Sequence, residues 1–130
     1  MTPQPEEQPA LGERELDVLQ VLWKRGDATV GDVQQSLAAA GAHLAYTTVQ
    51  TMLNRLEAKG IVGRRSAERA HVYYAVTQEE AVVGSAIGRL ASRFFGGRME
   101  ELATHLVEQG LGPDELERLH ALIEAQRRKS

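Results

Sequence analysis

Four apolar side chains recur at helical spacing between His43 and Gly60, at positions i, i+3, i+4 and i+7. This pattern predicts a helix over residues 46–59 with one buried face. The apolar stripe consists of Val49, Met52, Leu53 and Leu56. The other face carries hydrogen-bonding groups and cations, namely Thr47, Thr48, Thr51, Asn54, Arg55 and Lys59. Such side chains can reach base edges or phosphates in a major groove. An ordinary solvated helix explains this stretch equally well, so the neighbouring elements have to decide.

Two more helices are predicted upstream of this stretch. Residues 13–25 place leucines and Trp23 on one face. Thr29 begins a second helix, with Asp32 in the position of a capping box. This second helix ends in the Ala-Ala-Ala-Gly of residues 38–41.

Residues typical of β-strands replace the helical period after Gly60. Two short runs, 61–65 and 72–76, flank a polar loop at 66–70 and predict a β-hairpin. Three helices followed by a basic hairpin is the element order of a winged helix-turn-helix, whose wing is the hairpin. We therefore predict a mainly α fold with a small β-hairpin wing over residues 11–76. The wing would bring three arginines beside the phosphate backbone: Arg64, Arg65 and Arg69.

Three further amphipathic helices are predicted over residues 77–130. The first begins at a capping box from Thr77 to Glu80 and the third begins at Pro113. A unit of roughly fifty residues rarely buries enough apolar surface alone, so we predict a dimerisation region completed by a second copy. The residues assigned to this interface, with packing inside one subunit as the alternative, are Leu90, Phe94, Leu102, Leu106, Leu119 and Ile123.

Charge is distributed unevenly along the 130-residue chain, whose formal net charge is −3. Residues 46–76 contain five cations and two acids, whereas residues 77–130 contain seven cations and nine acids. The positive charge therefore lies where a nucleic acid would be bound. Residues 1–10 contain three of the four prolines and are predicted to be a disordered tail. Because no apolar run is long enough to span a bilayer and no secretory signal is evident, we expect a cytoplasmic protein.

Enzymatic and metal chemistry find little support in the sequence. The chain has no cysteine, so disulfides, thiol nucleophiles and thiolate metal sites are excluded. The four histidines lack the spacing of metal ligands. Phosphate-binding glycine loops, a nucleophile elbow and a carboxylate pair with a histidine partner are all missing. We expect a protein that is not an enzyme and that needs no cofactor.

Several segments resemble the penicillinase and methicillin-resistance repressors, the BlaI/MecI family. The resemblance begins with Leu-Gly-Glu-Arg-Glu-Leu-Asp-Val-Leu-Gln-Val-Leu-Trp at 11–23. It continues through Tyr-Thr-Thr-Val-Gln-Thr-Met-Leu-Asn-Arg-Leu-Glu-Ala-Lys-Gly at 46–60 and His-Val-Tyr-Tyr-Ala-Val at 71–76. Phe-Phe-Gly-Gly at 94–97 and Leu-Gly-Pro-Asp-Glu-Leu-Glu-Arg-Leu at 111–119 extend it to about residue 125. The resemblance implies a homodimeric winged-helix repressor that binds a palindromic operator through the third helix and the wing.

The chain departs from this family at three points. In antibiotic-responsive members, a membrane sensor metalloprotease triggers cleavage at an Asn-Phe bond in the fifth helix, and the matching residues here are His105 and Leu106. Copper-responsive relatives use a cysteine-rich motif that this chain lacks. Ala45 stands where the family commonly has a helix-capping serine. An alanine at this position lowers the stability of the helix by about 1 kcal/mol relative to serine.

We therefore predict a transcriptional repressor that occludes its operator as a homodimer. The resemblance alone implies that it is released by loss of the dimer, through proteolysis between the two regions or within the fifth helix. Two alternatives stay open: a winged-helix regulator that senses a small molecule, and a winged-helix protein-interaction module without DNA binding. Asn54 has an alternative role in bracing the wing. The residues predicted to contact DNA are Tyr46, Thr47, Thr48, Gln50, Thr51, Asn54, Arg55, Arg64, Arg65 and Arg69.

Overall fold

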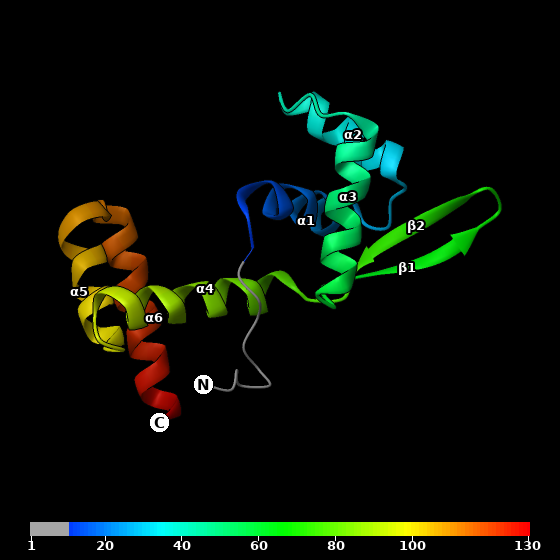
Figure 1. The fold of residues 1–130 in the computed structure, drawn as a ribbon. Helices are drawn as coiled ribbons and strands as arrows, with labels where there is room; N and C mark the ends of the chain where they lie inside the picture. The colour runs from blue at the N-terminus through cyan, green and yellow to red at the C-terminus, as the bar shows by residue number, and fades with distance from the viewer. Residues whose placement is uncertain (1–10) are drawn as a thin grey trace. The chain divides into compact units, whose positions relative to one another are not determined.

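The computed structural model describes residues 11–130 (Figure 1). The predicted disordered tail, residues 1–10, lies outside the described residues. The chain divides into two compact units between Ser85 and Ala86. This division falls inside a helix, and the predicted boundary between a DNA-binding domain (11–76) and a dimerisation region (77–130) stays a prediction.

The first unit contains three helices and a hairpin in the predicted order. The elements are α1 (Glu13–Arg25), α2 (Val30–Ala39), α3 (Tyr46–Ala58), β1 (Val62–Ala67) and β2 (Ala70–Ala75). The predicted capping box of α2 is confirmed, because Asp32 N–H donates to Thr29 Oγ1 and Thr29 N–H donates to Asp32 Oδ2, both at 3.1 Å. The hydrogen bonds from Thr29 hold the pKa of Asp32 below its ordinary value. At α3, Ala45 occupies the N-cap and supplies no side-chain acceptor, as the sequence indicates.

The hairpin is longer than predicted. Pairing runs from Val62 opposite Ala75 to Ala67 opposite Ala70, which leaves a turn of Glu68 and Arg69. The predicted polar loop at 66–70 was therefore wrong. Both faces of the ribbon are exposed near its tip, so polar residues there can pair as strand without burying any side chain.

A third, one-residue strand segment joins the base of this ribbon. Ala28 N–H donates to the Tyr73 carbonyl (3.0 Å), and Tyr73 N–H donates to the Ala28 carbonyl (2.8 Å). Next to this bridge, the ring of Tyr74 lies over Gly63, where an added Cβ would collide with it. The root of the hairpin is thus fixed to the α1–α2 connection.

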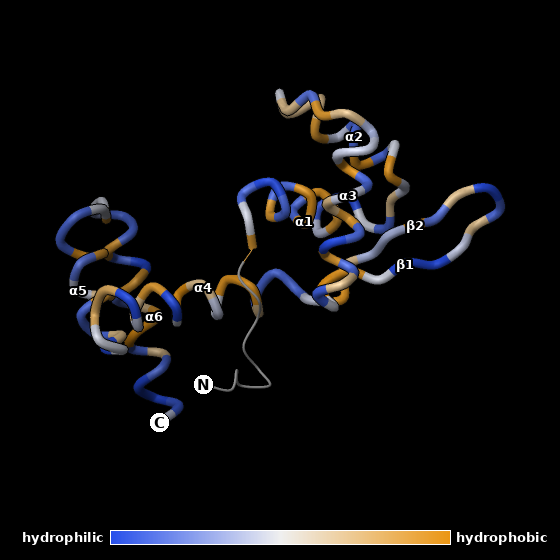
Figure 2. Tube along the Cα trace, viewed as in Figure 1, coloured by the Kyte–Doolittle hydropathy of each residue, from blue (hydrophilic) through white to orange (hydrophobic). Residues whose placement is uncertain are grey.

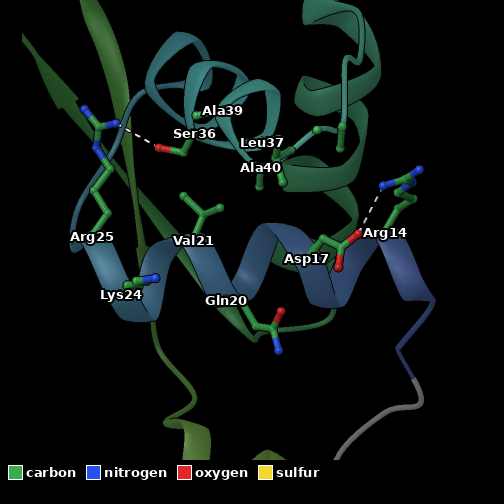
Figure 3. Close-up of a pocket in the computed structure, with 12 residues that line it drawn as sticks. Arg14, Asp17, Gln20, Val21, Lys24, Arg25, Ser36, Leu37, Ala39 and Ala40 are labelled. Atoms are coloured by element: carbon green, nitrogen blue, oxygen red, sulfur yellow. Dashed lines mark hydrogen bonds and ion pairs between the residues drawn. The ribbon is translucent and has the colours of Figure 1, made fainter.

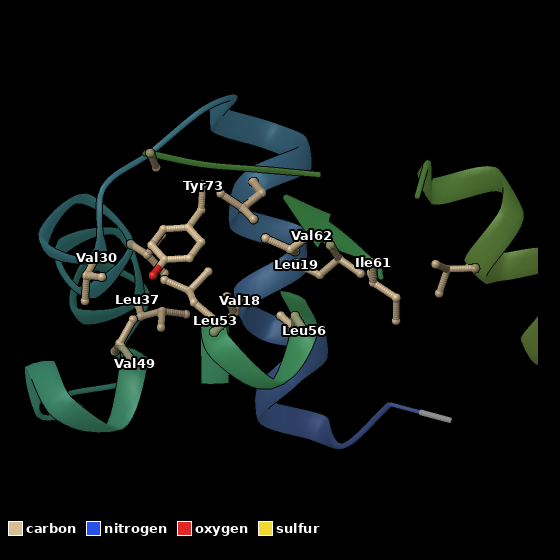
Figure 4. Close-up of a cluster of buried hydrophobic side chains, with 14 residues drawn as sticks. Val18, Leu19, Val30, Leu37, Val49, Leu53, Leu56, Ile61, Val62 and Tyr73 are labelled. Carbon is tan, nitrogen blue, oxygen red and sulfur yellow. The ribbon is translucent and has the colours of Figure 1, made fainter. Parts of the chain in front are cut away.

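The core of the first unit forms between the three helices and the hairpin (Figure 4). The predicted stripe of α3 is confirmed, with Met52 at its half-buried edge. The side chain of Tyr73 reaches from β2 into the core among residues of the helices. The largest fully buried side chains are Tyr73, Leu19, Leu53, Leu56, Ile61, Val18, Val33, Val49 and Val62.

The remaining helices are α4 (Glu79–Phe94), α5 (Met99–Gly110) and α6 (Pro113–Lys129). Gln78, not Thr77 as predicted, precedes α4, because the Gln78 carbonyl accepts from Ala81 and Val82 while Thr77 N–H donates to the Ile61 carbonyl. Polar and apolar positions alternate along all three helices (Figure 2). Within the described residues 86–130, only Ala91 and Leu102 are buried. None of the helices in the described part of the chain is long and apolar enough to cross a membrane.

Candidate nucleic-acid interface

The polar face of α3 is open to solvent opposite its buried stripe. All of the residues predicted there are exposed, and Arg55 forms no ion pair within residues 11–130. Thr51 Oγ1 donates to the Thr47 carbonyl at 2.9 Å, so its hydroxyl proton is already used and the oxygen is left to act as an acceptor. The exposed residues of this face are Tyr46, Thr47, Thr48, Gln50, Thr51, Asn54 and Arg55.

Lys59 anchors the end of α3 to α1. Its Nζ lies 2.8 Å from Oε1 and 3.0 Å from Oε2 of Glu15, whose Oε1 also accepts from Gly12 N–H at 3.1 Å. Glu15 is only 9% exposed, so the pair lies at the edge of the core. Lys59 was predicted among the cations of the polar face, and it is exposed there, but its ammonium is paired with the nearly buried carboxylate of Glu15.

The pKa of Glu15 is lowered despite its burial. Burial acts to raise this pKa, and the hydrogen bonds from Lys59 and Gly12 together with the nearby cations outweigh it. The ionised pair therefore contributes stability above the carboxyl's unfolded-state pKa, and this contribution is lost as pH falls through the lowered value.

We expect Glu15→Gln to lower the free energy of unfolding by roughly 1–3 kcal/mol at neutral pH, because the hydrogen bonds to a charged group are lost. The difference from the parent should shrink as pH falls below about 4, where the parent's own carboxylate becomes protonated. Urea unfolding at fixed protein concentration between pH 3 and 7 would measure it. A difference that stays constant over this range would contradict the ion pair.

Contacts with the hairpin hold the opposite flank of α3. Arg64 Nε lies 3.5 Å from Glu57 Oε2, and the Tyr73 hydroxyl donates to Asn54 Oδ1 at 3.4 Å. Asn54 is thus in contact with the wing while it stays exposed, which agrees with the bracing role left open above. The helix is fixed on both flanks, and its outer face keeps a defined orientation.

The three wing arginines differ in their surroundings. Arg65 Nη1 lies 2.7 Å from Asp27 Oδ2, and Arg64 is paired with Glu57. Arg69 lies at the turn and has no ion-pair partner in the described part of the chain. All three are exposed, so phosphate contact stays a prediction for each of them.

The residues predicted at the dimer interface separate into two groups. Leu90, Phe94, Leu106 and Ile123 are exposed, with Phe94 at 74% and Leu106 at 56%. Leu119 is half-buried, while Leu102 is 7% exposed and packs mainly inside its own unit. Little of the surface of Leu102 is therefore available for contact with a second subunit.

The residues that match the family's cleaved bond lie inside α5. His105 and Leu106 are both helical and exposed, and the His105 ring centroid is 5.9 Å from that of Phe95.

A shallow cleft between α1 and α2 is the natural place to look for a small-molecule site (Figure 3). Three of its four charged side chains are already partnered: Arg14 Nη1 lies 3.2 Å from Asp17 Oδ2, and Arg25 Nη1 donates to Ser36 Oγ at 2.9 Å. A ligand site usually has several polar groups that point into an unoccupied pocket, and this cleft does not have that arrangement. Within residues 11–130 no group of three or more His, Asp or Glu side chains could hold a metal ion.

Comparison with known proteins agrees with this geometry. A family model described as penicillinase repressor matches residues 11–125. The transcriptional regulator BlaI of Mycobacterium tuberculosis is 38% identical over 115 residues, which cover 87% of this chain and 82% of that protein. The penicillinase repressor of Bacillus licheniformis is 26% identical and covers 89% of this chain and 91% of its own length.

The fold comparison points the same way. The solution structure of the DNA-binding domain of the repressor BlaI superposes with a TM-score of 0.51 at 29% identity, covering 58% of this chain and 90% of that one. The predicted winged-helix fold class is thus confirmed, and the chain belongs to the penicillinase repressor family.

Proposed function

We propose that this protein is a transcriptional repressor, not an enzyme, and that it binds a pseudo-palindromic operator as a homodimer. The observation that carries the proposal is the exposed face of α3, fixed on both flanks and lying beside a basic hairpin. The names of its relatives, a transcriptional regulator and a penicillinase repressor, support the same function. Bound at a promoter, such a dimer blocks polymerase. Because the promoter is in the cytoplasm, we propose that the protein is cytoplasmic.

In the proposed complex α3 enters the major groove. Thr47, Thr48 and Thr51 offer short hydroxyl groups to base edges and phosphates, and Arg55 offers a guanidinium. The first N–H groups of α3 have no side-chain acceptor at Ala45 and are open to a phosphate oxygen. Gln50 and Asn54 lie on the flank toward the wing, whose arginines contact the backbone.

A second copy supplies the other half of the recognition. One short helix reads too few base pairs for selectivity, whereas a two-fold dimer reads two half-sites about one helical turn apart. The exposed apolar residues of α4, α5 and α6 support a dimer formed through this region. Release would follow loss of the dimer, through a membrane sensor metalloprotease and cleavage at or near His105–Leu106.

Selection of random duplex DNA by the purified protein tests the function directly. Near physiological salt, we expect enrichment of a two-fold-symmetric motif whose half-sites are about one turn apart. Binding that is only salt-sensitive and independent of sequence would reject the repressor and favour a protein-interaction module. A ligand-sensing regulator would instead show a thermal shift with a small molecule.

We expect Arg55→Ala to weaken operator binding by roughly 1–3 kcal/mol if Arg55 reads a base. Arg55→Lys separates the two possible contacts, because lysine keeps a phosphate contact and loses a bidentate pair with guanine. Arg14→Ala is the matched control, since it removes the same charge from α1, where Arg14 is paired with Asp17. Operator affinity that is equal for all three variants and the parent would exclude Arg55 from the interface.

A further inference from the structure

Two carboxylates from different elements are paired with consecutive arginines of the wing. Asp27 Oδ2 lies 2.7 Å from Arg65 Nη1, and Glu57 Oε2 lies 3.5 Å from Arg64 Nε. Asp27 directly precedes the residue that bridges β2, whereas Glu57 belongs to α3. Acids this close to a DNA-binding surface are unfavourable for affinity, so their positions call for an explanation.

Strand geometry places the two pairs on opposite faces of the hairpin. Consecutive side chains of a strand point to opposite sides, so Arg64 and Arg65 leave β1 in opposite directions. Arg64 stands across the ladder from Tyr73, whose side chain is in the core, and Arg65 stands across from Val72. The two carboxylates therefore restrain β1 from both of its faces.

The turn of the same hairpin provides the contrast. Glu68 and Arg69 are adjacent there and exposed, and neither forms an ion pair in the part of the chain that the structure describes. Proximity of opposite charges on the wing is thus not enough to produce a pair. The two pairs at its root depend on groups supplied by the α1–α2 connection and by α3.

We propose that Asp27 and Glu57 are positioning residues that hold Arg64 and Arg65 on the protein and so weaken the binding of the wing to DNA. The two pairs persist until the hairpin lies against the phosphate backbone of an operator. The proposal rests on the DNA-binding function above. An arginine already neutralised by a carboxylate gains less from a phosphate, and the carboxylate itself repels the backbone.

The two ion pairs behave differently on operator and on random DNA because base contacts by α3 fix the position of the protein only on the operator. On random duplex, α3 makes no base contacts that hold the hairpin in one place, and the two ion pairs persist. On an operator, base contacts by α3 fix the position of the wing and bring phosphates close to it. The guanidinium groups, each with five N–H donors, then bind phosphate.

The test compares Asp27→Asn and Glu57→Gln with the parent protein, as full-length chains. Fluorescence anisotropy would give affinities for the selected operator and for a random duplex of the same length, over a range of salt concentrations. We expect operator affinity to rise roughly 2- to 5-fold, the scale of an exposed ion pair, because the variant no longer loses that pair when its arginine binds phosphate. Affinity for random duplex should rise less, so the ratio of operator to random affinity rises as well. The slope of log K against log salt for random duplex should steepen by up to about 1.

Two controls separate release of an arginine from simple loss of negative charge. Glu68→Gln removes the same charge from the same hairpin without releasing an arginine, and Asp17→Asn releases Arg14 on α1. Both should leave the affinity ratio unchanged. Unchanged affinities and slopes in Asp27→Asn and Glu57→Gln would overturn the positioning role, as would an equal rise of the ratio in Glu68→Gln. A parent protein that selects no operator would overturn the repressor function as well.

Discussion

Leu106→Glu should convert the protein into a monomer that no longer binds a two-half-site operator tightly. Leu106 is 56% exposed on α5, one turn beyond Leu102, so its side chain projects from a helix that is already anchored to its unit. A carboxylate placed in an apolar intersubunit seam would lose its hydration without gaining a partner. Coupling of two half-sites is worth about 100- to 10,000-fold in affinity, and the variant should lose a factor of this order.

Sedimentation and operator titration would check this result together. Thr104→Glu is the matched control, because Thr104 is an exposed polar residue of the same helix, about 200° around the helix axis from Leu106. This control should stay dimeric. Binding of the Leu106→Glu variant to a single half-site should equal that of the parent, which shows that the DNA-binding unit is folded. A dimer that survives Leu106→Glu would place the interface elsewhere.

Leu53→Ala should destabilise the DNA-binding unit by about 2–5 kcal/mol. Leu53 is fully buried on α3 and packs in the core with residues of α1, α2 and the hairpin (Figure 4). Removing three carbon atoms leaves a cavity that surrounding helices can only partly fill. In a unit of this size, each kcal/mol lowers the melting temperature by roughly 4–8 °C. Since α3 is itself the proposed recognition helix, operator binding should fail at a correspondingly lower temperature.

Thermal unfolding followed by circular dichroism would measure the loss. Val76→Ala provides the comparison, because Val76 is exposed next to the hairpin and its truncation should change stability by about 0.5 kcal/mol or less. Equal melting temperatures for Leu53→Ala and the parent would mean that the stripe of α3 is not the centre of the core.

Apolar periodicity and local helix-start signals made much of this fold predictable. The stripe of α3, the capping box at Thr29 and the proline that opens α6 each specify a local structure that tertiary packing does not override. A feature with neither kind of signal was missed. Ala28 joins the sheet as a single residue, and one residue carries no alternation that could be recognised.

The polar face of α3 was predictable as a set but not residue by residue. Helical spacing places Lys59 with the other cations, yet the nearly buried carboxylate of Glu15, 44 positions away, binds it. In the same way, spacing alone does not separate Leu102, which its own unit buries, from Leu106, which stays exposed. Contacts between residues far apart in the sequence determine whether such a side chain is paired, buried or exposed. A local sequence pattern carries no information about those contacts.

Because of the bridge between Ala28 and Tyr73, the root of the wing is more rigid than its tip. At its root the ribbon is three strands wide and carries Tyr73 into the core, whereas toward Glu68 and Arg69 it is an isolated pair of strands. Two-stranded ribbons are only marginally stable in water, so amide exchange should be slow at the root and fast at the tip. The hairpin is thus flexible at its tip and rigid at its root. In the proposed complex the flexible tip can adapt to grooves of different width, while the rigid root keeps a constant angle to α3.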